Sequence, residues 1–148
     1  MTYAELDDGL IALAEALRPA LLRASRHLRR EAQKAGVSAL DAQLLGVIAK
    51  RPGIGGGELA DVEQMSAPSM SAHLKRLEAA GWIVREAPRA DDRRRVGVRV
   101  TAEGAAALET IRQRRNDWLV ARLAALGPKE RRALRAASEP LRRLAGDR

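Results

Sequence analysis

An arginine-rich stretch near the middle of the chain carries the most distinctive chemistry of the sequence. It reads RADDRRRVGVRV over residues 89–100, and two aspartates directly precede Arg93, Arg94 and Arg95. Adjacent guanidinium groups repel one another, so this run is expected at the surface, where an external polyanion can bind it.

A second group of residues suited to binding lies shortly before it, over residues 66–76. Met70, Leu74 and Leu77 follow helical spacing and predict a buried helix face. The other sides of that helix carry small, hydroxyl-bearing and basic side chains. Small residues allow close approach to base edges, and hydroxyl and basic groups contact bases or phosphates. The candidate contact residues are Ser66, Pro68, Ser69, Ser71, Ala72, His73, Lys75 and Arg76.

Charge and length set the frame for these two groups. The chain has 148 residues, a formal net charge of +8 and a pI near 11.1. Its length suits one domain with one core. Residues 66–99 carry a net +4 and residues 105–148 a net +6, whereas residues 1–65 carry −1. This balance favours a polyanionic partner, either a nucleic acid or an acidic membrane surface.

Several function classes are disfavoured by the composition. The chain has no cysteine, which excludes disulfides, thiol switches and thiolate metal sites. Its two histidines, His27 and His73, are far apart and form no metal motif. No apolar run approaches the ~18 residues of a membrane span, and the acidic start lacks a signal-peptide pattern. No nucleophile or acid–base pair has catalytic spacing. We therefore expect a cytoplasmic protein that is no enzyme and has no cofactor.

The elements that must position the two groups are mostly helices. A leucine stripe from Leu6 to Leu28 predicts a first helix, and Pro19 is expected to kink or restart it. Further helices are expected over residues 38–50, 58–65, 66–81, 101–126 and 128–145, with a turn over 51–57. Ser38, Ser66 and Thr101 are the predicted N-caps of three of them. Two short strands are expected over residues 82–87 and 96–101, and in the second the alternation of Val96, Val98 and Val100 predicts one buried face.

The order of these elements predicts a winged helix-turn-helix. A short helix is followed by a tight turn, a second helix and a two-stranded hairpin whose loop, residues 88–95, carries the arginine run. The second helix would enter the major groove of double-stranded DNA, and the hairpin loop would reach the adjoining minor groove or backbone. The expected fold class is mainly α with a small β-hairpin wing.

Several motifs resemble the MarR family of bacterial transcription regulators. They are SALDAQLLGVIAK, LEAAGWIVR, DWLVARLAALGPKERRAL and, in the hairpin, the spacing Asp92-x-Arg94-x-x-x-Val98. The resemblance implies that Arg94 enters the minor groove and that Asp92 orients it. It also implies a homodimer, with dimerisation helices in residues 1–35 and 102–148 and a DNA-binding lobe in residues 38–101.

The resemblance further implies a repressor released by a small-molecule effector, often an aromatic acid or a phenol bound between the dimer helices and the DNA-binding lobe. Pocket residues are not assigned by it, and Arg23, Arg26 and His27 are candidates only by position. The chain departs from the family pattern in two places. Gly55 and Gly56 stand where Thr-Pro is common, which weakens the cap of the short helix. Ala72 stands where a basic residue is common, so His73 or Arg76 is the candidate for that contact.

Two other classes of protein would also explain the basic charge. A nonspecific nucleoid-associated or RNA-binding protein would also be strongly basic, and a DNA footprint would separate it from a sequence-specific regulator. Membrane-surface binding would be detected by sedimentation with liposomes. Taken alone, the arginine run could be a solvated turn, and Ser69 and Ser71 could be residues that only start a helix.

Overall fold

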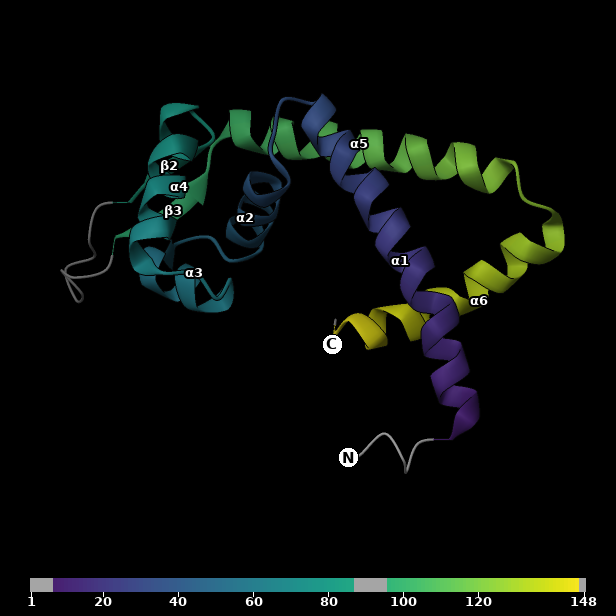
Figure 1. Cartoon of the computed structure of the whole chain (residues 1–148). Helices are drawn as coiled ribbons and strands as arrows, with labels where there is room; N and C mark the ends of the chain where they lie inside the picture. The colour runs from purple at the N-terminus through teal and green to yellow at the C-terminus, as the bar shows by residue number, and fades with distance from the viewer. Residues whose placement is uncertain (1–6, 87–95, 147–148) are drawn as a thin grey trace.

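The computed structural model of the chain describes residues 7–86 and 96–146 (Figure 1). Its helices are α1 (Asp8–Lys34), α2 (Ala39–Lys50), α3 (Gly56–Val62), α4 (Ala67–Ala79), α5 (Ala102–Ala124) and α6 (Pro128–Ala145). Its strands are β1 (Ile54–Gly55), β2 (Ile83–Arg85) and β3 (Gly97–Val100). A mainly helical fold with a small antiparallel sheet confirms the expected class.

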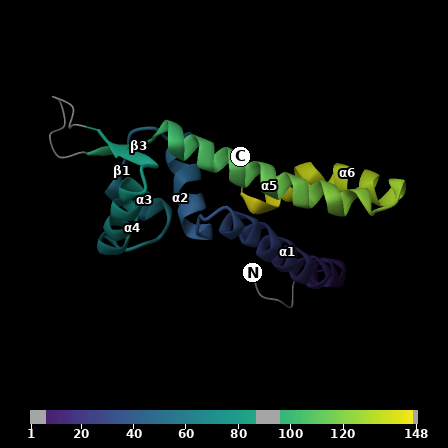
Figure 2. The same ribbon diagram turned by 90° about the horizontal axis from the view of Figure 1, so that it is seen from above.

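The elements form a lobe at one end of the molecule and an extended helical part at the other. Helices α2, α3 and α4 gather with the sheet in the lobe, and α5 runs from the lobe to α6 at the far end (Figures 1 and 2). The lobe has its own apolar core, because each helix and strand contributes one buried face. The core side chains are Leu44, Leu45, Ile48, Ile54, Leu59, Ala60, Met70, Leu74, Leu77, Ile83 and Val98.

Side-chain caps begin α2, α4 and α5 at the expected residues, which are Ser38, Ser66 and Thr101. The Oγ of Ser38 accepts a hydrogen bond from the Asp41 N–H at 3.0 Å. Thr101 Oγ1 likewise accepts from the Gly104 N–H at 3.1 Å. Such caps satisfy N–H groups that have no partner inside the helix. Helix α3 has no side-chain cap, because its N-cap is Gly55.

The sheet has three strands, one more than expected. Residues 51–57 were expected to be a turn only, but Ile54 and Gly55 form β1 and pair with Val98 and Gly97 of β3. The order is β1-β3-β2, and all pairs are antiparallel. A strand of only two residues beside glycines is too short to show the alternation of apolar and polar residues that predicts a strand. It forms here because β3 offers it backbone hydrogen bonds. Val96 precedes β3 and is exposed, which corrects its expected burial.

Contrary to the sequence prediction, Pro19 does not interrupt the first helix. Helix α1 is continuous from Asp8 to Lys34 with Pro19 inside it. The N-terminal part of α1 is largely exposed, so water can bond the carbonyl that Pro19 leaves without a donor. The short helix α3 also begins two residues earlier than predicted, at Gly56, and ends at Val62.

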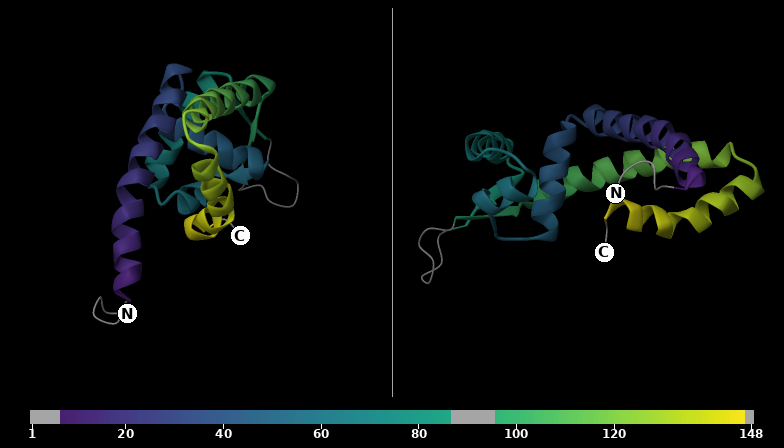
Figure 3. Two further views of the ribbon diagram at one scale, coloured as in Figure 1. Left: turned by 90° about the vertical axis from the view of Figure 1, so that its right-hand side faces the viewer. Right: turned by 60° about the horizontal axis from the view of Figure 1, so that its bottom comes forward.

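A second, smaller core joins the lobe to the extended helices. Ala32 of α1, Ala42 of α2 and Ile111 of α5 are buried together, and Trp82 packs against both this cluster and the core of the lobe. Beyond this junction α1 and α6 extend without a shared buried core (Figure 3). Their exposed apolar side chains include Leu10, Leu13, Leu21, Leu22, Leu134 and Leu144. None of the helices in residues 7–86 and 96–146 contains an apolar stretch of membrane-spanning length.

Candidate nucleic-acid interface

Helix α4 turns one face into the lobe and the other toward solvent. Met70, Leu74 and Leu77 are buried in the core, as their spacing predicted. The candidate DNA-contact residues of α4 are all exposed except His73, which is half-buried. The outer surface of α4 is therefore made of small, hydroxyl-bearing and basic side chains. We call these residues, Ser66 to Arg76 without Met70 and Leu74, the α4 face.

The N-terminal end of α4 is closed by two serines. Ser66 Oγ accepts a hydrogen bond from the Ser69 N–H at 3.3 Å, and the two hydroxyl oxygens lie 3.0 Å apart. Pro68 lies in the first turn, where its missing N–H costs no helical hydrogen bond. The positive end of the helix and these hydroxyl groups together suit a phosphate or a base-edge acceptor.

Two residues of the α4 face also make contacts inside the lobe. The guanidinium of Arg76 donates to both carboxylate oxygens of Asp41, from Nη2 to Oδ1 at 2.6 Å and from Nε to Oδ2 at 3.3 Å. Its Nη2 also lies 2.7 Å from Nδ1 of His73. Sequence patterns missed Asp41, because an acidic residue in the first turn of α2 is explained by the helix dipole alone.

The other basic side chains of the lobe differ in how they are held. Lys75 is exposed and forms no ion pair with any residue of the described ranges. Arg85 on β2 donates to Glu78 at the end of α4, with an Nε–Oε2 distance of 3.1 Å. Arg99 on β3 pairs with Glu86 across the hairpin. Lys75 is thus free to bind an external anion, whereas Arg85 and Arg99 are each already paired with a carboxylate of the lobe.

The arginine run of the hairpin loop lies outside the described residues. Asp92, Arg93, Arg94 and Arg95 therefore keep the roles that the sequence predicted, without a structural account. The strands on either side of the loop are described, and Val84 pairs with Arg99 and Arg85 with Val98. The strands that flank this segment thus form the antiparallel pair that the sequence predicted.

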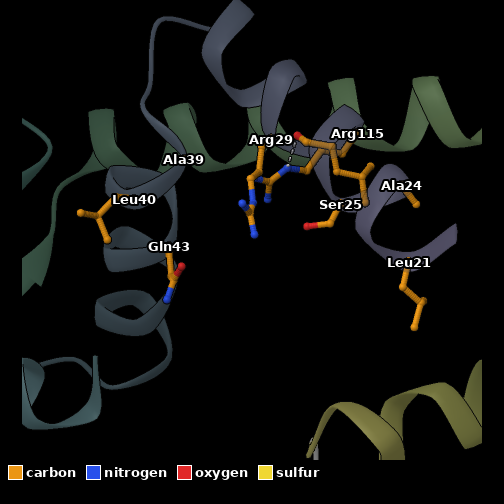
Figure 4. Close-up of a pocket in the computed structure, with 9 residues that line it drawn as sticks. Leu21, Ala24, Ser25, Arg29, Ala39, Leu40, Gln43 and Arg115 are labelled. Carbon is orange, nitrogen blue, oxygen red and sulfur yellow. Dashed lines mark hydrogen bonds between the residues drawn. The ribbon is translucent and has the colours of Figure 1, made fainter. Parts of the chain in front are cut away.

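An open pocket of about 860 Å³ lies where α1, α2 and α5 meet (Figure 4). Its walls are apolar, with polar groups from all three helices. Ser25, Arg29 and Gln43 point into the space between α1 and α2. Arg115 of α5 is held at the back of the pocket, because its Nε donates to the carbonyl of Leu28 at 3.1 Å. The lining residues are Leu21, Ala24, Ser25, Leu28, Arg29, Ala39, Leu40, Gln43 and Arg115.

The three residues that were pocket candidates by position do not line this space. Arg23 and His27 line a separate pocket of about 800 Å³ on the other side of α1, and His27 stacks on Trp118 with a centroid distance of 5.1 Å. Arg26 lines neither of the two pockets. No sequence signal distinguished Arg29 from the neighbouring arginines, because the face of α1 that meets α2 depends on how the two helices pack.

Comparison with known proteins agrees with this arrangement. A model of the MarR family matches residues 35–95. An uncharacterised HTH-type transcriptional regulator of Mycobacterium bovis is 35% identical over 132 residues, which are 89% of this chain and 92% of that protein. The chain belongs to the MarR family. The family consists of transcription regulators that bind DNA, typically as dimers.

Solved structures of MarR-type proteins share the fold over nearly the whole chain. A proposed transcriptional regulator from Pseudomonas aeruginosa superimposes with a TM-score of 0.80 at 34% identity, over 95% of this chain and 98% of that one. A variant of MepR from Staphylococcus aureus, solved bound to an oligodeoxyribonucleotide, superimposes with a TM-score of 0.69 at 17% identity, over 92% and 98%. The protein is a MarR-family transcription regulator with a DNA-binding fold.

Proposed function

We propose that the protein is a homodimeric, sequence-specific repressor that binds a pseudo-palindromic DNA operator and is released by a small molecule. The observation that carries this proposal is the α4 face, a solvent-facing surface of small, hydroxyl-bearing and basic residues on the second helix of a helix-turn-helix. Such a helix fits the major groove. The MepR variant of the same fold was solved with DNA, which supports this use of the lobe.

Dimerisation is supported by the uncovered apolar side chains of the extended helices. Leu10 and Leu13 of α1, Val120 of α5 and Leu144 of α6 are each more than half exposed. Apolar surface of this extent on long helices marks an association surface. A two-fold dimer presents two α4 helices and reads half-sites about one helical turn apart, ~10 base pairs.

The α4 face should separate into residues that choose the sequence and residues that hold phosphate. DNA selection with the purified protein should yield a pseudo-palindrome. Ser69→Ala and His73→Ala should relax the preference at one position of each half-site. Lys75→Met should weaken binding to all sequences alike and reduce the salt slope by roughly one unit per contact. Affinities at several salt concentrations measure both effects.

Three outcomes would contradict this division or the function itself. Unchanged selection and affinity in both Ser69→Ala and His73→Ala would show that α4 does not read the sequence as proposed. Selection of no motif by the wild-type protein would favour the nonspecific nucleoid-associated or RNA-binding alternative. Sedimentation with anionic liposomes but not with DNA would favour a membrane surface.

The hairpin loop carries the second proposed contact, with Arg94 in the minor groove and Asp92 holding its guanidinium. Arg94→Ala should weaken operator binding by roughly 10-fold to 100-fold, because a bound guanidinium and its groove contacts are lost. Asp92→Ala raises the positive charge, so electrostatics alone predicts tighter binding. Loss of orientation predicts weaker binding to the operator, since an unheld arginine loses rotamer freedom on insertion.

Melting temperature serves as the control for both loop variants. An exposed pair contributes at most about 1 kcal/mol to folding, so neither substitution should change the melting temperature appreciably. If Asp92→Ala binds the selected operator more tightly at fixed salt, the aspartate does not orient the arginine.

The pocket between α1, α2 and α5 is the proposed effector site. Apolar walls with the guanidinium groups of Arg29 and Arg115 suit a small aromatic acid or a phenolate, whose ring is apolar and whose oxygen is anionic. The pocket touches the lobe through α2 and the extended helices through α1 and α5. A ligand there can therefore change how the two lobes of a dimer are placed, and so release the operator.

A substitution in the pocket should separate effector response from DNA binding. Arg29→Gln should lower the affinity for an aromatic acid that releases the operator by roughly 10-fold, because one charge-assisted hydrogen bond is lost. Operator affinity without effector should stay within about twofold. Arg23→Gln, in the separate pocket, is the matched control and should leave the response unchanged. Equal loss of response in both variants would place the effector elsewhere.

A further inference from the structure

Asp41 holds a buried charge at the boundary between α2 and α4. Its side chain is 9% exposed, and it lies in the first turn of α2, where the Ser38 cap fixes its backbone N–H. A buried carboxylate needs a partner that neutralises it. Arg76 supplies that partner with two donors, while 54% of the Arg76 side chain remains exposed. The pair therefore ties the outer surface of α4 to the start of α2.

The same guanidinium determines which nitrogen of His73 carries a proton. Nη2 of Arg76 lies 2.7 Å from Nδ1 of His73. A guanidinium has only donors, so Nδ1 must accept this hydrogen bond and cannot itself bear a proton. Neutral imidazole then carries its proton on Nε2. Asp41 Oδ1 lies 3.8 Å from the same Nδ1, beyond hydrogen-bond distance, so it accepts no hydrogen bond from this nitrogen.

The second ring nitrogen of His73 remains available to solvent. Among the described residues, every buried side-chain nitrogen or oxygen has a hydrogen-bond partner. His73 makes its hydrogen bond through Nδ1, on the side of Arg76, and 22% of its side chain is exposed. Its Nε2 is therefore a solvent-accessible N–H donor on the α4 face.

We propose that Asp41 and Arg76 are positioning residues that hold His73 as a fixed Nε2–H donor, and that this donor reads guanine in the major groove. This rests on the proposed DNA-binding function of α4. Guanine presents two acceptors, N7 and O6, at the major-groove edge, so a donor that cannot become an acceptor favours it. Asp41 itself does not touch the DNA and acts through Arg76 and His73.

Removing the guanidinium should change the protonation of the ring in a defined way. Arg76→Met keeps the aliphatic part of the side chain and removes the donor to Nδ1 of His73. The Asp41 carboxylate then needs a new donor, and a small side-chain rotation would bring a protonated Nδ1 of His73, now 3.8 Å from Oδ1, within hydrogen-bond distance. Arg76→Lys keeps a group that has only donors and should preserve the wild-type state.

Nitrogen NMR of the imidazole in the whole protein measures this state directly. Spectra of the neutral ring should show wild-type His73 with a bare Nδ1 and a protonated Nε2. Arg76→Met should show a protonated Nδ1, and Arg76→Lys and Lys75→Met should match wild type. Lys75→Met is the matched control, because it removes one positive charge from α4 without touching His73. A bare Nδ1 in folded Arg76→Met would overturn the proposal.

DNA selection tests the reading of guanine. Wild type should prefer guanine at one position of each half-site, and His73→Ala should lower this preference about fivefold, the worth of one neutral hydrogen bond. Arg76→Met should lower the same preference, and the double variant should lose no more than His73→Ala alone. Lys75→Met should keep the preference while weakening all sequences.

The two experiments separate the failure of this proposal from failure of the function. Absence of any selected motif would remove the proposed function, whereas the NMR result would still report on the Asp41–Arg76–His73 network. If His73→Ala lowers the affinity for all sequences equally and leaves the base preference unchanged, His73 contacts a phosphate. That result would overturn the reading of guanine. Additive losses in the double variant would mean that Arg76 binds DNA by itself and would overturn its positioning role.

Discussion

Replacing Leu134 and Leu144 with glutamine is expected to convert the protein to monomers and to weaken operator binding at least ~100-fold, since linked half-sites add affinity of this order. Both side chains belong to α6, which buries none of its residues within the single chain. They are 45% and 67% exposed there, so the folding of one chain does not depend on them. Glutamine keeps the helix propensity and adds no charge.

The two sides of α6 explain why these leucines should meet a second copy. Its apolar residues lie on one side, and most of its basic residues lie on the opposite side. The apolar side is Ala133, Leu134, Ala137, Leu141 and Leu144, and the basic side is Arg131, Arg132, Arg135, Arg142 and Arg143. An amphipathic helix whose apolar side is not buried by the described residues of its own chain is stabilised by burying that side elsewhere.

Analytical sedimentation at micromolar concentration, together with operator titration, measures this prediction. Val62→Gln is the control, because Val62 is 47% exposed and lies on α3 in the lobe, away from the extended helices. It should sediment as wild type. A double leucine variant that remains dimeric, or a monomer that still binds the operator at full affinity, would contradict the proposed assembly.

Replacing Gly104 with alanine is expected to lower the free energy of unfolding by about 3 kcal/mol, at the upper end of the cost of overpacking. A Cβ at this position would lie 2.1 Å from the carbonyl oxygen of Trp82 and 2.8 Å from Cγ1 of Val100. The same carbonyl accepts from the Thr101 N–H at 3.0 Å, so it is not free to move. Helix α5 would have to shift away from the sheet.

Thermal and denaturant unfolding measure the loss, which corresponds to a melting temperature lower by about 10 °C for a chain of this size. Gly57→Ala is the matched control. Gly57 lies in α3 with no atom within 4 Å of an added Cβ, so alanine there should be neutral or stabilising by up to about 1 kcal/mol. Similar melting temperatures for Gly104→Ala and Gly57→Ala would show that the contact with Trp82 relaxes without cost.

Much of the lobe could be predicted from local patterns alone. The spacing of Met70, Leu74 and Leu77 predicted the buried side of α4, and with it the outward side, because helical periodicity places residues on faces without knowledge of the partner. Ser66 and Thr101 predicted helix starts, since a cap bonds to residues only two or three positions away. The arginine run and the net charge predicted a polyanionic partner, and the order of the elements then indicated DNA.

Tertiary structure decided the features that depend on residues far apart in the chain. Asp41 and Arg76 are 35 positions apart, and only the packing of α4 on α2 brings them together. The same holds for β1, which exists because β3 offers it a partner, and for the pocket, where α1, α2 and α5 converge on Arg29 and Arg115. Helix α1 continues through Pro19 because that stretch is open to water. The sequence determined which face of each helix or strand is apolar, because that pattern repeats over neighbouring residues. Packing decided which faces contact each other, because each contact depends on elements from distant parts of the chain.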